Sequence, residues 1–322
     1  MGKTSKTSKR DTVLQELKAT AQSQLLEFLI EKQVRKSRSA IKSLLAHKQI
    51  RVNGKLITQF DHELNAGDKV SVMKFDQSRK EKRLKGMTIV FEDDDLIIVD
   101  KEAGLLSVST DTEKTRTAYN VLNEYVKKKG KTLRVFVLHR LDREVSGLLI
   151  FAKNQEVQEM FQRNWDHLVP KYTYTAVLNG QPEKKKGTIV SWLTENKNLV
   201  MQSSPRDNGG LKAVTHYKVI KSVGNYTLAE IDLETRRKNQ LRVQMQSIGC
   251  PVVGDKKYGA KTNPIKRIGL HAGTLTLRHP MTNEVLEFKS TIPKVMQSLV
   301  TAQPKPRKEE NISQTKENDT SN

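Results

Sequence analysis

Apolar positions along the first quarter of the chain have the spacing of short helices and then of short strands. In residues 25–29, and again in residues 41–45, apolar side chains lie three and four positions apart, which predicts two helices that each bury one face. Asn53 and Gly54 then separate two short apolar runs, and KVSVM follows at residues 69–73. The predicted order is helix, helix, tight hairpin, strand.

Beyond residue 87 the pattern is mostly that of extended segments. The strand-like runs are TIVF, LIIVD, VFVLH, GLLIFAK, YTYTAVL, TIVSWL, TLAEIDL, TLTLR and VLEFK. Helical spacing recurs at residues 118–127, 155–165, 241–248 and 295–300. Because many strands follow one another directly, we expect antiparallel pairing. The predicted fold class is α+β: a small α/β domain followed by a larger mixed domain with a largely antiparallel sheet.

Charge divides the chain in the same place. The 322 residues contain 57 Lys and Arg against 36 Asp and Glu, a net charge of +21, and residues 1–86 alone hold 20 basic and 9 acidic residues. A basic excess of this size predicts a polyanionic partner, with a membrane surface as the rival. The predicted organisation is an N-terminal extension (1–23), a small basic domain (24–74), a basic linker (75–86), a large domain (87–300) and a disordered tail (301–322).

Several classes of protein are disfavoured by composition. The chain has one cysteine, Cys250, so neither an intramolecular disulfide nor a thiolate-rich zinc site is expected. It has no apolar run of membrane-spanning length and no Gly-rich phosphate loop. We therefore expect a cytoplasmic monomer without membrane attachment, metal, nucleotide or other cofactor.

The string HRLDREVSGLLIFAK (139–153) is the strongest candidate for chemistry. It places Asp142 between Arg140 and Arg143, directly after one strand-like run and before another. A carboxylate with cationic neighbours stays ionised, which is the state that a nucleophile requires. A structural salt bridge at a loop corner is the alternative that this pattern leaves open.

The small domain resembles the S-four RNA-binding domain, named after a small-subunit ribosomal protein. The resemblance rests on FL, SRSAIKSLL, IRVNGK and LNAGDKV, in that order, within about residues 24–73. In that family a basic helix and the adjoining hairpin contact the RNA backbone, which implies such contacts for Arg38, Lys42 and Arg51. A solvated helix face is the alternative for Arg38 and Lys42.

The large domain resembles the RluA-type pseudouridine synthases over about residues 87–290. HRLDREVSGLLIFAK resembles their signature, YTYTAVLNG their strand with an active-site tyrosine, and LETRRKNQLRVQMQSIGCPVVGDKKYG a third block. The resemblance implies that Asp142 is the catalytic carboxylate, that Tyr174 lies in the active site and that Arg242 pairs with Asp142. It further implies that Arg140 holds a phosphate or the space left by a flipped base.

Some positions depart from the family pattern. The usual proline after Lys101 is Glu102 here, and the lysine two positions before the active-site tyrosine is Tyr172. In the third block, Arg236, Lys238 and Asn239 replace the Gly, Thr and His of the family's GRTHQ. These replacements put the RNA contacts of the block in doubt.

The implied reaction breaks the N-glycosidic bond of a uridine, rotates the uracil and rejoins it through a ring carbon, which needs no redox cofactor. Asp142 would either add to the anomeric carbon or assist formation of a glycal, and the resemblance leaves both routes open. The target base must leave its stack, and Tyr174 would stack on it and help the final proton removal. The implied substrate is structured RNA, with large-subunit ribosomal RNA favoured and transfer RNA left open.

Other functions compete with this one. A catalytically inactive RNA-binding or ribosome-assembly factor would keep the small domain but has no need for Asp142. A hydrolase would need a second carboxylate, for which only Glu144 stands near. We interpret Asp93–Asp95 as an acidic turn rather than a metal site, His139 as a hydrogen-bonded structural residue and Cys250 as a packing residue.

Overall fold

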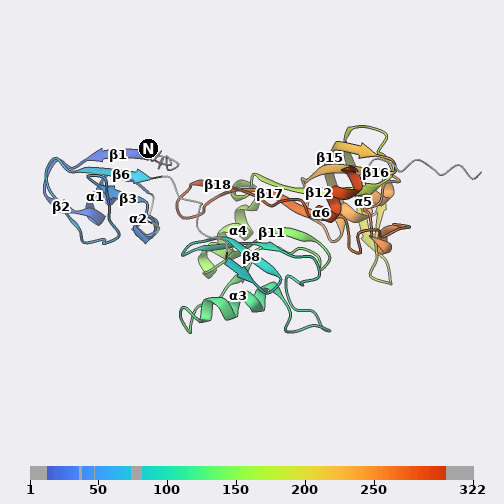
Figure 1. Ribbon diagram of the computed structural model, residues 1–322, viewed down its shortest axis with the longest axis horizontal. Coiled ribbons are helices and arrows are strands. Elements are labelled where there is room, and N and C mark those ends of the chain that lie inside the picture. Colours follow the sequence, from blue (N-terminus) through green and yellow to red (C-terminus); the bar gives the residue numbers. More distant parts are fainter. Residues whose placement is uncertain (1–12, 36–37, 47, 74–81, 302–322) are drawn as a thin grey trace, which may run out of the picture.

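The computed structural model describes residues 13–35, 38–46, 48–73 and 82–301, and it shows two bodies that follow each other along the chain (Figure 1). Each body has a hydrophobic core of its own, one built from residues 19–72 and the other from residues beyond 87. The predicted tail, apart from Thr301, lies outside the described residues, as do the first part of the extension and most of the linker.

Within its described residues, the small domain has two helices and two small sheets. Its elements are β1 (Val13–Lys18), β2 (Ser23–Gln24), α1 (Leu25–Glu31), α2 (Arg38–Ala46), β3 (Ile50–Val52), β4 (Lys55–Leu56), β5 (Glu63–Leu64) and β6 (Lys69–Met73). The four-stranded sheet has the order β1-β6-β3-β4, and β2 pairs with β5. The apolar faces of both helices are buried as predicted, including Leu25, Leu29, Ile41 and Leu44.

The predicted hairpin is present between β3 and β4. Asn53 and Gly54 both have positive φ, 50° and 80°, which is the backbone that a two-residue turn of this twist requires. The small sheet begins earlier than residue 24, because β1 pairs antiparallel with β6 from Val13 onward. The sequence carries little sign of this edge strand, since its side chains are mostly exposed and show no alternation of burial.

The large domain is built on one twelve-stranded sheet. Its strands are β7 (Lys82–Leu84), β8 (Met87–Glu92), β9 (Leu96–Lys101), β10 (Phe136–Val137), β11 (Ser146–Ala152), β12 (Lys171–Asn179), β13 (Lys186–Glu195), β14 (Met201–Ser204), β15 (Leu211–Val223), β16 (Tyr226–Leu233), β17 (Leu270–Arg278) and β18 (Val285–Lys289). Ten of them follow the order β14-β13-β15-β16-β12-β17-β11-β9-β8-β7, while β10 pairs with β11 and β18 with β17. All pairings are antiparallel except that of β11 with β17, so the predicted sheet type is confirmed.

The helices of this domain lie close to the predicted positions. They are α3 (Ala118–Lys127), α4 (Gln155–Leu168), α5 (Gln240–Ser247), the short 3₁₀ helix η1 (Lys256–Tyr258) and α6 (Lys294–Thr301). Thr117 and Asn154 cap α3 and α4, because each side chain accepts a hydrogen bond from a backbone N–H in the first turn. Strands β14 and β15 were not predicted, since β15 is rich in lysine and largely exposed in its second half.

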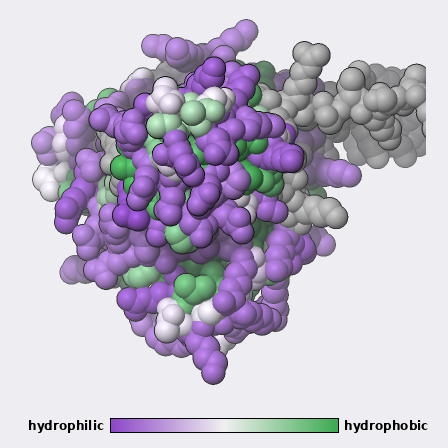
Figure 2. Space-filling view, turned by 90° about the vertical axis from the view of Figure 1, so that its left-hand side faces the viewer, coloured by the Kyte–Doolittle hydropathy of each residue, from purple (hydrophilic) through white to green (hydrophobic). Residues whose placement is uncertain are grey.

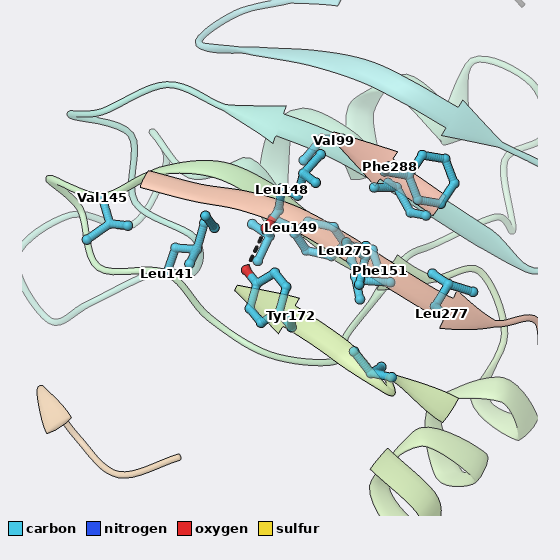
Figure 3. Packing of buried hydrophobic residues seen from close by; sticks show 14 of the residues in the cluster. Val99, Leu141, Val145, Leu148, Leu149, Phe151, Tyr172, Leu275, Leu277 and Phe288 are labelled. Atoms are coloured by element: carbon cyan, nitrogen blue, oxygen red, sulfur yellow. Dashed lines mark hydrogen bonds between the residues drawn. The ribbon is translucent and has the colours of Figure 1, made fainter. Parts of the chain in front are cut away.

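Strand β11 is the centre of the domain, and all seven of its residues are buried. Figure 3 shows Leu148, Leu149 and Phe151 of this strand packed among residues of neighbouring strands. Gly147 has a φ of +114°, and a Cβ atom there would lie 2.2 Å from the carbonyl oxygen of Ala272. Only glycine therefore permits the close parallel approach of β11 and β17, which fixes the start of β11 directly after the Asp142 loop.

The surface at the small-domain end is predominantly hydrophilic, with apolar residues in small separate areas (Figure 2). Within the described ranges, no helix has both the length and the apolar character needed to cross a membrane.

Candidate active site

Asp142 lies on the loop between β10 and β11, and this loop is tied to the segment that follows β9. The hydroxyl of Ser107 donates to the carbonyl oxygen of Leu141 (2.7 Å) and accepts from its amide (3.0 Å). The amide of Gly104 donates to the carbonyl oxygen of Arg143 at 2.7 Å. The backbone on both sides of Asp142 is therefore fixed by the same segment.

Lys101, the last residue of β9, lies beneath this loop and is completely buried. Its ammonium donates to the carbonyl oxygens of Leu105 (2.8 Å) and Glu102 (3.0 Å), with longer contacts to those of Asp142 (3.3 Å) and Arg143 (3.4 Å). Burial, together with the positive charge of nearby Arg267, lowers the pKa of Lys101 to about 8. We predicted no role for Lys101 from the sequence. A lysine at the end of an apolar strand nevertheless indicates a buried and functionally important cation.

Arg242 contacts the carboxylate of Asp142. It stands in the first turn of α5, and its Nη1 donates to Oδ2 of Asp142 at 2.8 Å. The Arg242 side chain is 11% exposed, whereas that of Asp142 is 42% exposed. Within the described part of the chain, Arg242 is the only side chain that donates to this carboxylate, so Oδ1 stays available to a ligand.

A second carboxylate, Asp255, holds Arg242 from the other side. Nε and Nη2 of Arg242 donate to the two oxygens of Asp255 at 2.6 and 2.9 Å, and Asp255 is completely buried. Nη1 also donates to Oδ1 of Asn239 at 3.1 Å, and the guanidinium lies 5.0 Å from the ring centre of Tyr258. Burial alone would lower the pKa of Arg242, but the hydrogen bonds and charge of Asp255, with the charge of Asp142, raise it above its usual value. Arg242 is therefore a permanently charged link between two carboxylates.

Helix α5, which carries Arg242, is anchored by two buried glutamines on one face. Gln240 donates to the carbonyl oxygen of Val214 (3.0 Å) and to the hydroxyl of Thr215 (2.9 Å). Gln244 accepts from the hydroxyl of Thr215 (2.6 Å) and donates to the hydroxyl of Ser191 (2.8 Å). These bonds to β13 and β15 fix where the helix begins, because buried polar groups strongly favour being paired.

Tyr174 of β12 is half-buried beside Asp142. Its ring lies 5.2 Å from that of Tyr172 on the same face of the strand. The hydroxyl of Tyr172 donates to the carbonyl oxygen of Leu148 at 2.6 Å, shown as a dashed line in Figure 3, so Tyr172 is committed to the core. Burial, and to a smaller extent the charge of Asp142, raise the pKa of Tyr174 to about 12. Tyr174 is therefore a neutral phenol at neutral pH.

Two adjoining cavities meet at Asp142 and Tyr174. The smaller one has a volume of about 100 Å³ and is also lined by Arg242, Leu233 and Leu270. The larger one, of about 470 Å³, is bounded by a wider set of side chains and falls in the size range of ligand sites. A carboxylate oriented by an arginine and placed where two cavities meet is suited to react with a bound ligand.

The chain is similar to known proteins in sequence and in fold. The family model for RNA pseudouridylate synthase matches residues 95–247, which include Asp142, Tyr174 and Arg242. The uncharacterized RNA pseudouridine synthase YlyB of Bacillus subtilis is 32% identical over 270 residues, which cover 82% of this chain and 88% of that protein. The chain belongs to the RNA pseudouridine synthase family.

A further relative and one solved structure show the same likeness. Ribosomal large subunit pseudouridine synthase D of Haemophilus influenzae is 29% identical over 275 residues, covering 80% of this chain and 84% of that protein. Human RNA Pseudouridylate Synthase Domain Containing 4 has the same fold, with a TM-score of 0.53 and 24% identity over 66% of this chain and 92% of that one. The predicted family, fold class and enzyme class are confirmed.

The three departures from the family's GRTHQ block occupy different surroundings. Arg236 lies over the ring of Trp165 at 5.5 Å, and Lys238 pairs with Glu195. Asn239 has a left-handed backbone (φ 52°) and bonds to Arg242 and to the hydroxyl of Tyr258. The sequence pointed only to RNA contacts here, whereas Asn239 supports the arginine that holds Asp142.

The basic residues predicted to bind RNA lie in two places. Arg140 is exposed and lines both cavities at Asp142. Arg38 and Lys42 are exposed on α2, and Lys42 lies 5.4 Å from the ring centre of Phe60. Arg51 of β3 is half-buried and contacts the carbonyl oxygen of Gly54 at 3.5 Å. None of the three small-domain residues lines the cavities at Asp142.

The structural interpretation of His139 is confirmed. Its Nε2 accepts the backbone amide of Ile150 at 3.1 Å, and burial lowers its pKa to about 3. The imidazole is therefore neutral and holds the strand that follows the Asp142 loop. Cys250 is likewise buried, and burial raises the pKa of its thiol, as expected of a packing residue.

The acidic turn at Asp93–Asp95 is also confirmed. Oδ1 of Asp93 accepts the amides of Asp95 (2.8 Å) and Leu96 (2.7 Å), and Oδ2 accepts from Nε2 of His279 at 2.8 Å. Since Nδ1 of His279 accepts the amide of Thr282, Nε2 must carry the hydrogen. The side chains of Asp93, Asp95 and His279 lie close enough together to hold a metal ion. The His279 imidazole, however, offers no lone pair to a metal in this arrangement.

Proposed function

We propose that this enzyme isomerises specific uridines of ribosomal RNA to pseudouridine, with Asp142 as the catalytic carboxylate. The observation that carries the proposal is the placement of Asp142, whose Oδ2 is held by Arg242 at 2.8 Å while the side chain is 42% exposed at the junction of two cavities. A buried structural ion pair would not leave one carboxylate oxygen available beside a ligand-sized space.

Asp142 acts on the ribose of the target uridine. Its ionised carboxylate either adds to the anomeric carbon as uracil leaves, or assists loss of a ribose proton as a glycal forms. On either route uracil departs with the electron pair of the N-glycosidic bond, turns within the site and reattaches through C5. The new bond to the anomeric carbon displaces the Asp142 oxygen on the first route, and on the glycal route the ribose regains the proton that it lost. The C5 proton is then released and N1 gains one, so the product is an isomer and no cofactor is consumed.

Tyr174 holds the base during this sequence. Its ring lines both cavities beside Asp142 and offers an aromatic face for stacking of the flipped uracil. Because its pKa is about 12, the phenol is protonated at neutral pH. Its hydroxyl can receive the C5 proton only while giving up its own, so Tyr174 acts as a relay and not as a tyrosinate base.

Two arginines complete the site. Arg242 orients Asp142 through a charge-assisted hydrogen bond, and Asp255 supplies the second support of that guanidinium. Arg140, exposed at the mouth of both cavities, holds a phosphate or the space that the flipped base leaves. Arg140 therefore places positive charge where the RNA backbone must approach.

Ribosomal RNA is favoured as the substrate by the names of relatives, several of which are ribosomal large subunit pseudouridine synthases. The basic helix of the small domain would add contacts with the RNA backbone through Arg38, Lys42 and Arg51. A monomer suffices because one chain supplies Asp142 and Arg242, and a cytoplasmic location follows from action on bacterial-type ribosomal RNA.

The test is a site-by-site map of pseudouridine in total ribosomal and transfer RNA from cells with and without this gene. Cells that lack it are complemented with wild type or with Asp142→Asn, and RNA binding by both purified proteins is measured alongside. We expect signal to vanish at defined ribosomal uridines and to return only with wild type, while Asp142→Asn still binds RNA. An unchanged map would favour a catalytically inactive binding factor, and loss at transfer RNA positions would correct the substrate.

A further inference from the structure

A row of aromatic rings leads away from Asp142 along one wall of the larger cavity. Tyr174 contacts Tyr172 with ring centres 5.2 Å apart, Tyr172 contacts His139 at 5.1 Å, and His139 contacts Trp165 at 5.1 Å. All three contacts are edge-to-face, and all four residues line the cavity of about 470 Å³. The row therefore connects the position of the target base to a second site at Trp165.

Arg236 covers the outer end of this row. Its guanidinium lies 5.5 Å from the ring centre of Trp165 and lines the same cavity. Nη1 donates to Asp166 at 3.0 Å, but the Asp166 side chain is 87% exposed and that of Arg236 is 35% exposed. Exposed ion pairs of this kind contribute little, so this one fixes the guanidinium only weakly and can yield to a ligand.

The placement of Trp165 results from an irregularity in α4. Asn164 has non-helical dihedral angles (φ −136°, ψ 37°), so the helix is interrupted one residue before the tryptophan. The Nε1 atom of Trp165 is buried and, among the described residues, has no hydrogen-bond partner. An unsatisfied buried donor is uncommon, and this one belongs to a side chain that lines the cavity of about 470 Å³.

We propose that Trp165 and Arg236 form a subsite for a nucleotide next to the target uridine, a proposal that rests on the proposed function. The guanidinium of Arg236 lies over the indole and lines the cavity, where an unpaired base can stack on its plane. Stacking on an arginine plane tolerates every base, so the subsite selects an unstacked neighbour and not a particular sequence. The enzyme therefore requires a loop or bulge in which two adjacent nucleotides are splayed out.

The experiment is an equilibrium binding cycle with the full-length protein. The probe is the large-subunit ribosomal RNA fragment that wild type binds most tightly, prepared intact and with an abasic nucleotide at each unpaired position in turn. Wild type is compared with Arg236→Ala and Arg236→Lys, which keeps the charge without the stacking plane. Arg163→Ala is the matched control, because Arg163 is a 76% exposed arginine of the same helix as Trp165 and lies outside the cavity lining.

We expect one abasic position beside the target uridine to weaken wild-type binding by about tenfold, as the loss of one stacked base does. Both Arg236 variants should bind the intact probe as weakly as wild type binds that abasic probe, with no further loss when the two changes are combined. Arg163→Ala should keep the full response to the abasic position.

If every abasic position adds its effect independently to that of Arg236→Ala, or if Arg236→Lys behaves as wild type, Arg236 supplies charge only and the subsite is refuted. Pseudouridine formation in the same fragment reports separately on the proposed function. The cycle needs no turnover, so failure of the proposed function and failure of the subsite give different results.

Discussion

Nη1 of Arg242 lies 2.8 Å from Oδ2 of Asp142, although 100 positions separate the two residues in the chain. Lys101 and Ser107 fix the loop that carries Asp142, whereas Asp255 holds the guanidinium of Arg242. The orientation of the Asp142 carboxylate therefore depends on buried residues that lie behind the cavities.

Asp255→Asn should reduce both stability and activity. Removing the charge of Asp255 leaves the largely buried guanidinium of Arg242 with Asp142 as its remaining acidic partner, and breaking a buried ion pair costs on the order of 3–5 kcal/mol. Denaturant unfolding measures this cost, and kcat under saturating RNA should fall because Arg242 loses its fixed direction. The matched control is Asp166→Asn, which removes an exposed acid from another arginine. Equal effects of the two changes would contradict the anchoring role.

Activity should decrease above about pH 8 because Lys101 loses its proton. Its pKa in the folded protein is lowered from 10.5 to about 8, so the ammonium that holds the carbonyl oxygens of the Asp142 loop becomes neutral in this range. Lys101→Met should be less active and should lack this inflection in its pH profile. The same inflection in Lys101→Met would assign the titration to another group.

The same residue predicts an opposite trend in stability. Between about pH 8 and 10.5 the unfolded chain binds a proton at Lys101 that the folded chain does not, so this residue's contribution to stability rises with pH, by up to about 3 kcal/mol. Unfolding of wild type and Lys101→Met by denaturant at pH 7.5 and at pH 9.5 checks the sign. If the free energy of unfolding of wild type, relative to that of Lys101→Met, does not increase from pH 7.5 to pH 9.5, Lys101 titrates normally.

Asn239→Ala should lower kcat and stability together. Asn239 accepts from Arg242 at 3.1 Å and has a φ of 52°, a left-handed conformation that asparagine tolerates better than alanine does. The expected loss of stability is about 1–2 kcal/mol, of which Asn239→Gly should recover the backbone part. If Asn239→Gly also recovers kcat, the hydrogen bond to Arg242 has no role in the reaction.

Replacing Arg38 and Lys42 together by alanine should weaken RNA binding and reduce its salt dependence. Both side chains are exposed on α2, and removing one cation from a phosphate should lower the slope of log K against log salt by about 0.7–0.9. Lys114→Ala is a control, because Lys114 is an exposed lysine of the large domain. A slope that stays unchanged in the double variant would show that these cations only solvate the helix.

Elements whose signals are local could be predicted from the amino-acid sequence. Helix α3 begins and ends at the predicted residues 118 and 127, and the hairpin at Asn53 and Gly54 follows from the turn that these two residues favour. Periodicity also predicted most strands of the large sheet, since buried strands repeat apolar residues over short distances. The family motifs identified Asp142, Tyr174 and Arg242, because those blocks are continuous in the chain.

The contacts that support these residues depend on the three-dimensional packing of the chain. Asp255 contacts Arg242, which lies 13 positions away in the chain, and Lys101 contacts the Asp142 loop, 41 positions away. Trp165 of α4 contacts Arg236, which lies in a different segment. Such pairs depend on strand order, sheet register and the close approach at Gly147, which local propensity does not encode. The sequence therefore pointed to the candidate site residues, and the packing of distant segments determined their geometry.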